Sequence, residues 1–167
     1  MKHAQQQTIR SPSSPELYLD DYWDGILPVD PGAIARAAGV AVIADPALLA
    51  EGLSGKYAVE SGHPTIRYNP NESRVRQRFT IAHELGHHAL GHPESYRDPA
   101  ANFSSLSYDP AEAAANRFAA QLLMPREILL FKIGEMRSPR LAELAEAFDV
   151  SQFAMQYRLK RLGLLRG

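Results

Sequence analysis

Several features that mark particular classes of protein are missing from this sequence. Its 167 residues include no cysteine, which excludes disulfides, cysteine-ligated metals and cysteine nucleophiles. No apolar run approaches the roughly 18 residues that a membrane span needs, and the N-terminus lacks the apolar core of a signal peptide. The formal net charge is −1, so any contact with nucleic acid would have to be local. We therefore expect a soluble, cytoplasmic protein with no membrane partner.

The composition that remains is that of an ordinary globular protein. Hydrophobic residues make up 45% of the chain and charged residues 22%, which is enough apolar content for a core. Residues 1–16 are polar and rich in Pro and Ser, and they predict a disordered N-terminal arm. We expect one domain over residues 17–125, and a separate C-terminal unit packed on it over residues 126–167.

Local patterns in the first half predict helices beside a small sheet. Asp30 is a good N-cap and Gly39 a good C-terminal stop, so a helix should lie between them. The β-branched segment 40–43 predicts a buried strand. Apolar and polar residues alternate in segments 55–60 and 63–69, and a short Gly-containing turn separates the two, so the pattern predicts a hairpin. The expected fold class is α+β, mainly helical, with a small antiparallel sheet.

Four of the six histidines lie within ten residues, in the stretch "FTIAHELGHHALGH". The surrounding apolar residues recur at helical spacing, with a helix start near Asn69 or near Ser73. On a helix, His83 and His87 stand one turn apart on the same face and can bind one zinc ion together. Glu84 lies about 100° further round, where it can reach the water of that ion without ligating the metal.

A catalytic zinc usually has a third protein ligand, and two places in the sequence offer one. His88 and His92 are close by, but both are rotated away from the face that carries the pair. Glu112 is the only acidic residue of an alanine-rich helical segment, 111–125, that should pack closely on its neighbour. Asn116 lies one turn later on the same face and is a candidate to hydrogen-bond a metal-ligating side chain on the side away from the metal. The alternative is a chance histidine pair on a solvated helix face.

Two segments of the chain resemble the ImmA/IrrE-type metallopeptidases. They are "RFTIAHELGHHALGH" and "EAAANRFAAQLLMP", and the similarity extends over roughly residues 28–165. The resemblance implies a zincin-like fold with one Zn²⁺ per chain and a gluzincin-like third ligand. It implies His83, His87 and Glu112 as the zinc ligands and Glu84 as the general base. The chain departs from many members at Ala114, where they carry a second acidic residue.

Peptide hydrolysis also needs a donor that stabilises the oxyanion. The candidates in this sequence are Tyr57, Tyr68, His88 and His92, each of which is as compatible with a structural role. Strand 63–69, if it lies at the sheet edge, can pair with an extended substrate.

The C-terminal unit has the pattern of a helix-turn-helix. Ser138 and Ser151 are candidate N-caps of its two helices. Arg158, Lys160 and Arg161 are candidate DNA contacts near the end of the second helix. DNA binding is not the favoured interpretation, because the N-terminal end of that helix, where base contacts usually fall, is uncharged.

Together these patterns predict a zinc-dependent endopeptidase that cleaves a partner protein. The resemblance implies that the partner is an XRE-like helix-turn-helix transcriptional repressor or an antitoxin. Cleavage would relieve repression in a stress response, a mobile element or a toxin–antitoxin pair. The alternative is a DNA- or partner-binding regulator, or a toxin, whose zinc site has limited proteolytic activity.

Overall fold

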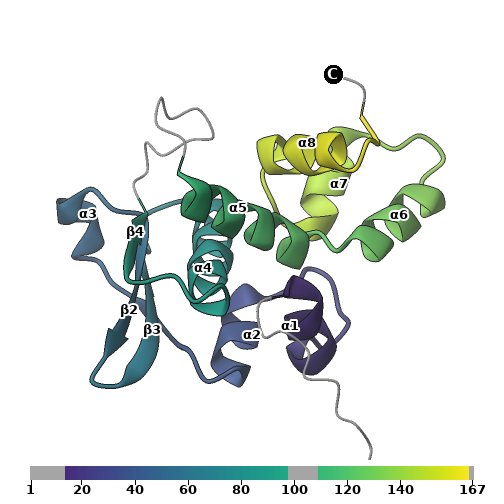
Figure 1. Ribbon diagram of the computed structural model, residues 1–167. Coiled ribbons are helices and arrows are strands. Elements are labelled where there is room, and N and C mark those ends of the chain that lie inside the picture. The colour runs from purple at the N-terminus through teal and green to yellow at the C-terminus, as the bar shows by residue number, and fades with distance from the viewer. Residues whose placement is uncertain (1–13, 98–108, 166–167) are drawn as a thin grey trace, which may run out of the picture.

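The computed structural model describes residues 14–97 and 109–165. The helices in these ranges are α1 (Pro15–Tyr22), α2 (Pro31–Ala37), α3 (Leu48–Glu51), α4 (Arg74–Ala89), α5 (Pro110–Leu123), α6 (Arg126–Glu135), α7 (Leu141–Phe148) and α8 (Gln152–Arg161). The strands are β1 (Ala41–Ala44), β2 (Gly55–Glu60), β3 (His63–Tyr68) and β4 (Ser95–Arg97). Helix α4 lies between the sheet and α5, and α6, α7 and α8 follow beyond α5 (Figure 1). The mainly helical α+β prediction is confirmed.

The sheet is mixed rather than wholly antiparallel as predicted. The strand order is β1-β3-β2-β4, and β1 pairs with β3 in parallel. The predicted hairpin of β2 and β3 is confirmed, and its two turn residues, Ser61 and Gly62, both have positive φ, as tight hairpin turns require. Strand β1 is mostly exposed, because it is an edge strand with Ile43 outside the core. The prediction that 40–43 is a buried strand is therefore wrong beyond Val40.

Strand β3 is central, so the predicted substrate pairing along an exposed edge of segment 63–69 is not possible. Both of its sides are already bonded, to β1 and to β2. The outer strands of the described sheet are β1 and β4.

Helix α4 is the centre of the fold. It starts at the later of the two predicted positions, with Ser73 as N-cap, and residues 80–87 are all buried. One of its faces packs on β2, where Gly55 lies so close to Thr80 that a Cβ at residue 55 would come within 2.4 Å of the threonine methyl. The face that carries His83 and His87 is turned toward α5.

Helix α5 packs closely along α4 because small residues line the contact. A Cβ added at Gly86 would lie 3.1 Å from Phe118, which itself is 2% exposed. On the other side of Phe118, Tyr18 of α1 packs edge-on with a centroid distance of 5.7 Å. The N-cap is Asp109, whose carboxylate accepts a hydrogen bond from the amide of Ala111 at 2.9 Å. The start of α5 is thus fixed by its N-cap, and the helix packs against both α4 and α1.

The segment that follows α6 contains the predicted pair of helices, α7 and α8, with one difference in their N-caps. Ser138 is not an N-cap, because α7 begins three residues later, after Arg140. Ser151 does cap α8, and its hydroxyl accepts a hydrogen bond from the amide of Ala154 at 3.0 Å. Phe153 is 58% exposed and does not join the core.

The turn between α7 and α8 is tied to the start of α4. Asp149 has a left-handed backbone with φ of 52°, and its carboxylate pairs with Arg74 at 2.7 Å. Arg78 donates to the carbonyls of Asp149 at 3.0 Å and of Val29 at 2.6 Å. These bonds join the C-terminal helices to α4 and to the segment before α2.

The predicted N-terminal arm of residues 1–16 is only partly testable. Residues 1–13 lie outside the described residues, whereas Pro15 and Glu16 are already the first turn of α1. Among the helices of residues 14–97 and 109–165, none combines the length and the apolar character that crossing a bilayer demands.

Candidate metal centre

Three side chains from α4 and α5 converge on one point. Nε2 of His83 lies 3.0 Å from Oε2 of Glu112, and Nε2 of His87 lies 2.9 Å from Oε1 of the same carboxylate. The two Nε2 atoms are 3.0 Å apart. All three side chains offer a metal-ligating atom within 4.8 Å of the others. The structure thus brings together the three residues that the sequence predicted as ligands.

Asn116 supports His83 from behind. Its Oδ1 lies 2.8 Å from Nδ1 of His83, on the side of the ring opposite Glu112. Because an amide oxygen only accepts, Nδ1 carries the hydrogen, and Nε2 of the neutral ring presents its lone pair to the convergence point. This contact fixes both the tautomer and the ring orientation, as carbonyl partners of metal-ligating histidines usually do.

His92 plays the corresponding part for His87. The two Nδ1 atoms are 2.9 Å apart, and the rings are 5.1 Å apart between centroids. The backbone explains how a residue beyond the helix comes so close. Gly91 has φ of 69°, its amide bonds to the carbonyl of His88, and the amide of His92 bonds to the carbonyl of His87. This is a Schellman motif, which folds the chain back over the last turn of α4.

The donor set fits a divalent metal ion. A tetrahedral ion with ligands at about 2.0–2.1 Å needs ligand atoms about 3.3 Å apart, close to the separations of 2.9–3.0 Å that His83, His87 and Glu112 show. Lone pairs of two neutral imidazoles and a carboxylate repel one another at this range unless a cation lies between them. Two nitrogen ligands and one carboxylate are the set that zinc hydrolases use.

Charge at the site is concentrated on Glu112. Burial by itself raises the pKa of this carboxyl, but when the Nε2 atoms of His83 and His87 carry protons instead of facing a metal ion, their hydrogen bonds and charges outweigh burial and hold the pKa far below its usual range. Glu112 is therefore an anion, and its side chain is 32% exposed, whereas those of His83 and His87 are 0% and 2% exposed. The centre is reached from the side of Glu112.

Glu84 is completely buried on the neighbouring face of α4. It lies one residue after His83 and on the side that faces β2, where a Cβ at Gly55 would come within 3.6 Å of its Cγ. The absence of a side chain at Gly55 leaves room for this carboxylate beside the strand. Glu84 is not among the three converging ligands, and its role as a base next to the metal stays a prediction.

The other predicted polar candidates have different surroundings. The hydroxyl of Tyr57 lies 2.9 Å from Nδ1 of His88, and burial raises the pKa of Tyr57 and lowers that of His88. This bond links β2 to α4, so a packing role is favoured for both residues. Tyr68 is half-buried at the end of β3, opposite Gly55 in the register.

The three candidate DNA contacts on α8 are not equivalent. Lys160 and Arg161 are exposed, but Arg158 is only 7% exposed and donates from Nε to the carbonyl of Met124 at 3.0 Å. A guanidinium held in this way supports the junction of α5 and α8, and it does not lie on the exposed side of α8 with Lys160 and Arg161. The structure gives less support to DNA binding than the charge pattern alone.

The fold and the convergent His-His-Glu set together define a domain of the metallopeptidase type. The model of the IrrE N-terminal-like domain family matches residues 35–160, which is most of the chain. This chain belongs to that family.

Individual relatives agree with this assignment. The chain is 31% identical over 93 residues to the metallopeptidase ImmA of Bacillus subtilis, and 36% identical over 107 residues to the radiation response metalloprotease IrrE of Deinococcus deserti. It is 31% identical over 109 residues to an uncharacterized immunity region protein of the Bacillus phage phi105. These matches cover 56%, 61% and 60% of the chain, and 54%, 38% and 68% of the relatives. The chain therefore spans about half the length of ImmA and a smaller part of IrrE.

Proposed function

We propose that the chain is a zinc-dependent endopeptidase that cleaves a partner protein. The observation that carries this proposal is the convergence of His83, His87 and Glu112, with Glu84 buried beside them. The family and the names of two relatives, a metallopeptidase and a metalloprotease, support the same activity. One Zn²⁺ per chain is the cofactor that this donor set favours.

In this proposal the residues of the chain have separate tasks. His83, His87 and Glu112 would hold the ion, which when bound would supply Lewis-acid polarisation of the scissile carbonyl and lower the pKa of water. Asn116 and His92 keep the two imidazoles aimed at it. The carboxylate of Glu84 takes one proton from the attacking water and delivers it to the leaving amine nitrogen, so that one C–N bond breaks as one C–O bond forms.

We propose as substrate a helix-turn-helix transcriptional repressor of the XRE-like kind, or an antitoxin with such a domain. This part of the proposal rests on the similarity to the ImmA/IrrE-type peptidases. Cleavage would relieve repression, and the absence of cysteine favours a cytoplasmic setting. We also keep the division into a peptidase domain over 17–125 and a packed C-terminal unit over 126–167 as a proposal.

The test is proteolysis of a purified helix-turn-helix repressor by the zinc-loaded protein, followed by mass analysis of the fragments. Glu84→Gln keeps the size of the side chain but removes the base, so we expect cleavage to fall about 10²–10⁴-fold while zinc stays bound. Glu143→Gln, on the surface of α7, is the matched control and should cleave at the parent rate. Parent-like cleavage by Glu84→Gln would remove this residue from the mechanism. An intact repressor with the zinc-loaded parent would overturn the substrate.

A further inference from the structure

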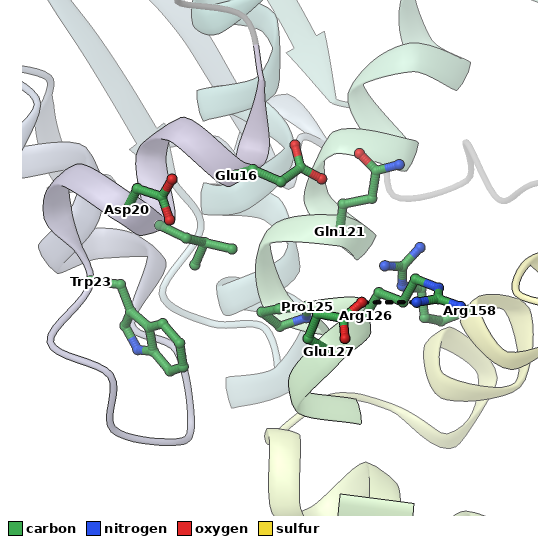
Figure 2. A pocket seen from close by; sticks show the side chains of 9 residues that line it. Glu16, Asp20, Trp23, Gln121, Pro125, Arg126, Glu127 and Arg158 are labelled. Carbon is green, nitrogen blue, oxygen red and sulfur yellow. Dashed lines mark hydrogen bonds and ion pairs between the residues drawn. The ribbon is translucent and has the colours of Figure 1, made fainter. Parts of the chain in front are cut away.

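A cavity lies away from the metal centre, where α1, α5, α6 and α8 meet. Its volume is about 360 Å³, at the lower end of the range for small-molecule sites. None of the residues of the metal centre lines it. The lining residues are Glu16, Leu19, Asp20, Trp23, Gln121, Pro125, Arg126, Glu127 and Arg158. We call it the α1–α8 pocket (Figure 2).

One wall of this pocket is cationic. Arg158 is 7% exposed, and its Nε donates a hydrogen bond to the carbonyl of Met124 at 3.0 Å. Among the described residues, no hydrogen-bond acceptor engages its two terminal nitrogens. Burial lowers the pKa of Arg158, while the nearby Glu16 opposes this shift. A buried guanidinium with free donors beside a cavity is a ready receptor for a carboxylate.

The opposite wall is anionic. Glu16 and Asp20 project from α1 toward the pocket, across from α8 and from Gln121 of α5 (Figure 2). The two remaining charged residues, Arg126 and Glu127, form an ion pair with each other at 2.8 Å and add no net charge. The pocket therefore presents opposite charges on facing walls.

Three apolar residues, Leu19, Trp23 and Pro125, also line the pocket. The indole nitrogen of Trp23 donates a hydrogen bond to the carbonyl of Ile26 at 3.1 Å. A ligand that matches all three surfaces carries a carboxylate at one end, an ammonium group at the other and an apolar side chain between them.

We propose that the α1–α8 pocket binds a small zwitterion of the amino-acid class, either a free amino acid or a dipeptide. Its carboxylate bonds to the terminal nitrogens of Arg158, its ammonium group faces Glu16 and Asp20, and its side chain covers Leu19 and Pro125. The proposal does not depend on peptidase activity, because no metal ligand takes part.

The location gives such binding a structural consequence. Arg158 links α8 to Met124, which is the C-cap of α5, the helix that carries Glu112. A ligand between Arg158 and Glu16 joins α1, α5 and α8. It therefore stabilises the folded chain, and the stabilisation rises with the logarithm of one plus the ratio of ligand concentration to dissociation constant.

Trp23 makes the proposal directly measurable, since it is the only tryptophan of the chain. The probes are leucine and the dipeptide Ala-Leu, titrated against intrinsic fluorescence, with N-acetyl-Ala-Leu and Ala-Leu-amide as controls that each lack one charge. We expect a saturable change with at least one of the two zwitterions, and binding about tenfold or more weaker for each capped form. The two probes separate an amino-acid site from a dipeptide site.

Matched variants assign the two walls. Arg158→Lys should weaken binding about tenfold or more, because it removes the forked donor pair, whereas Arg161→Lys makes the same change on the exposed side of α8 and should bind like the parent. Glu16→Gln, at an exposed position, should weaken binding a few-fold without affecting the fold. If Arg158→Lys does not fold, as circular dichroism will show, Glu16→Gln and the capped dipeptides decide the question. Absence of saturable binding, or equal binding of capped and free dipeptides, overturns the proposal.

Discussion

Two helix pairs in this molecule differ in how many polar residues they bury. In the α4–α5 pair, α4 buries Thr80, His83, Glu84 and His87 beside its apolar residues. The α7–α8 pair buries one charged residue, Arg158, and otherwise an apolar set of Leu144, Ala145, Phe148, Ala154, Met155 and Leu159. Burying polar groups costs free energy unless they find partners, so a sequence tolerates it where those groups have a task. The polar groups of the first pair include those of the proposed metal centre, whereas most of the second pair is an apolar core.

The first prediction tests whether α7–α8 is an ordinary core. Phe148 is fully buried, so Phe148→Ala should lower the free energy of unfolding by about 3–5 kcal/mol. Phe153 lies on the same helix pair but is 58% exposed, so Phe153→Ala should change the free energy of unfolding by less than about 0.5 kcal/mol. Equilibrium denaturation in urea measures both. Similar losses for the two variants would mean that the face with Phe153 is covered.

The second prediction tests whether the polar groups of α4–α5 are there for a metal. Asn116→Ala removes the oxygen that orients His83, and we expect zinc affinity to fall about 10–100-fold. Gln152→Ala removes an amide from the exposed start of α8 and should leave zinc affinity unchanged. Competition with a fluorescent chelator gives both values. Parent-like affinity in Asn116→Ala would show that the contact with His83 is only structural.

The third prediction compares the starts of the two pairs. The hydroxyl of Ser151 accepts a bond from an amide of α8, and Ser151→Ala should cost about 1 kcal/mol of stability. Ser73 precedes α4 without a capping bond from its side chain, so Ser73→Ala should cost clearly less. Thermal unfolding of the two variants under one set of conditions ranks them. The reverse order would contradict the assignment of caps.

Much of the α4–α5 pair could be predicted from the sequence, because a helix converts spacing directly into geometry. The interval of four residues between His83 and His87 places them on one face of a helix. Glu112 is the only carboxylate on the alanine-rich helix that follows, so it is the best candidate there for the third ligand. The sequence does not predict the contact of His92 with His87, because helical spacing rotates His92 away from the face of the pair. The signal that places it is Gly91, since a glycine after a helix favours the fold-back that carries the next residue over the last turn.

The remaining differences arise where long-range contacts override local pattern. Strand β4 has only three residues and forms by pairing with β2. So short a segment has no recognisable alternation of apolar and polar residues, and the sequence does not predict it. The β-branched residues of β1 lie in an edge strand that pairs with β3 but is mostly exposed. Its parallel pairing depends on the path of the chain through α3 and β2, which the sequence of β1 does not show. Arg158 belongs to a basic run, and its burial depends on the distant carbonyl of Met124.

The metal content of the purified protein tests the central claim most directly. Elemental analysis should find one zinc per chain in the parent and in Glu143→Ala, a surface control on α7. It should find little or none in Glu112→Ala, because two histidines alone leave the ion without its third ligand. A parent that binds no metal even after zinc is added back would contradict the account.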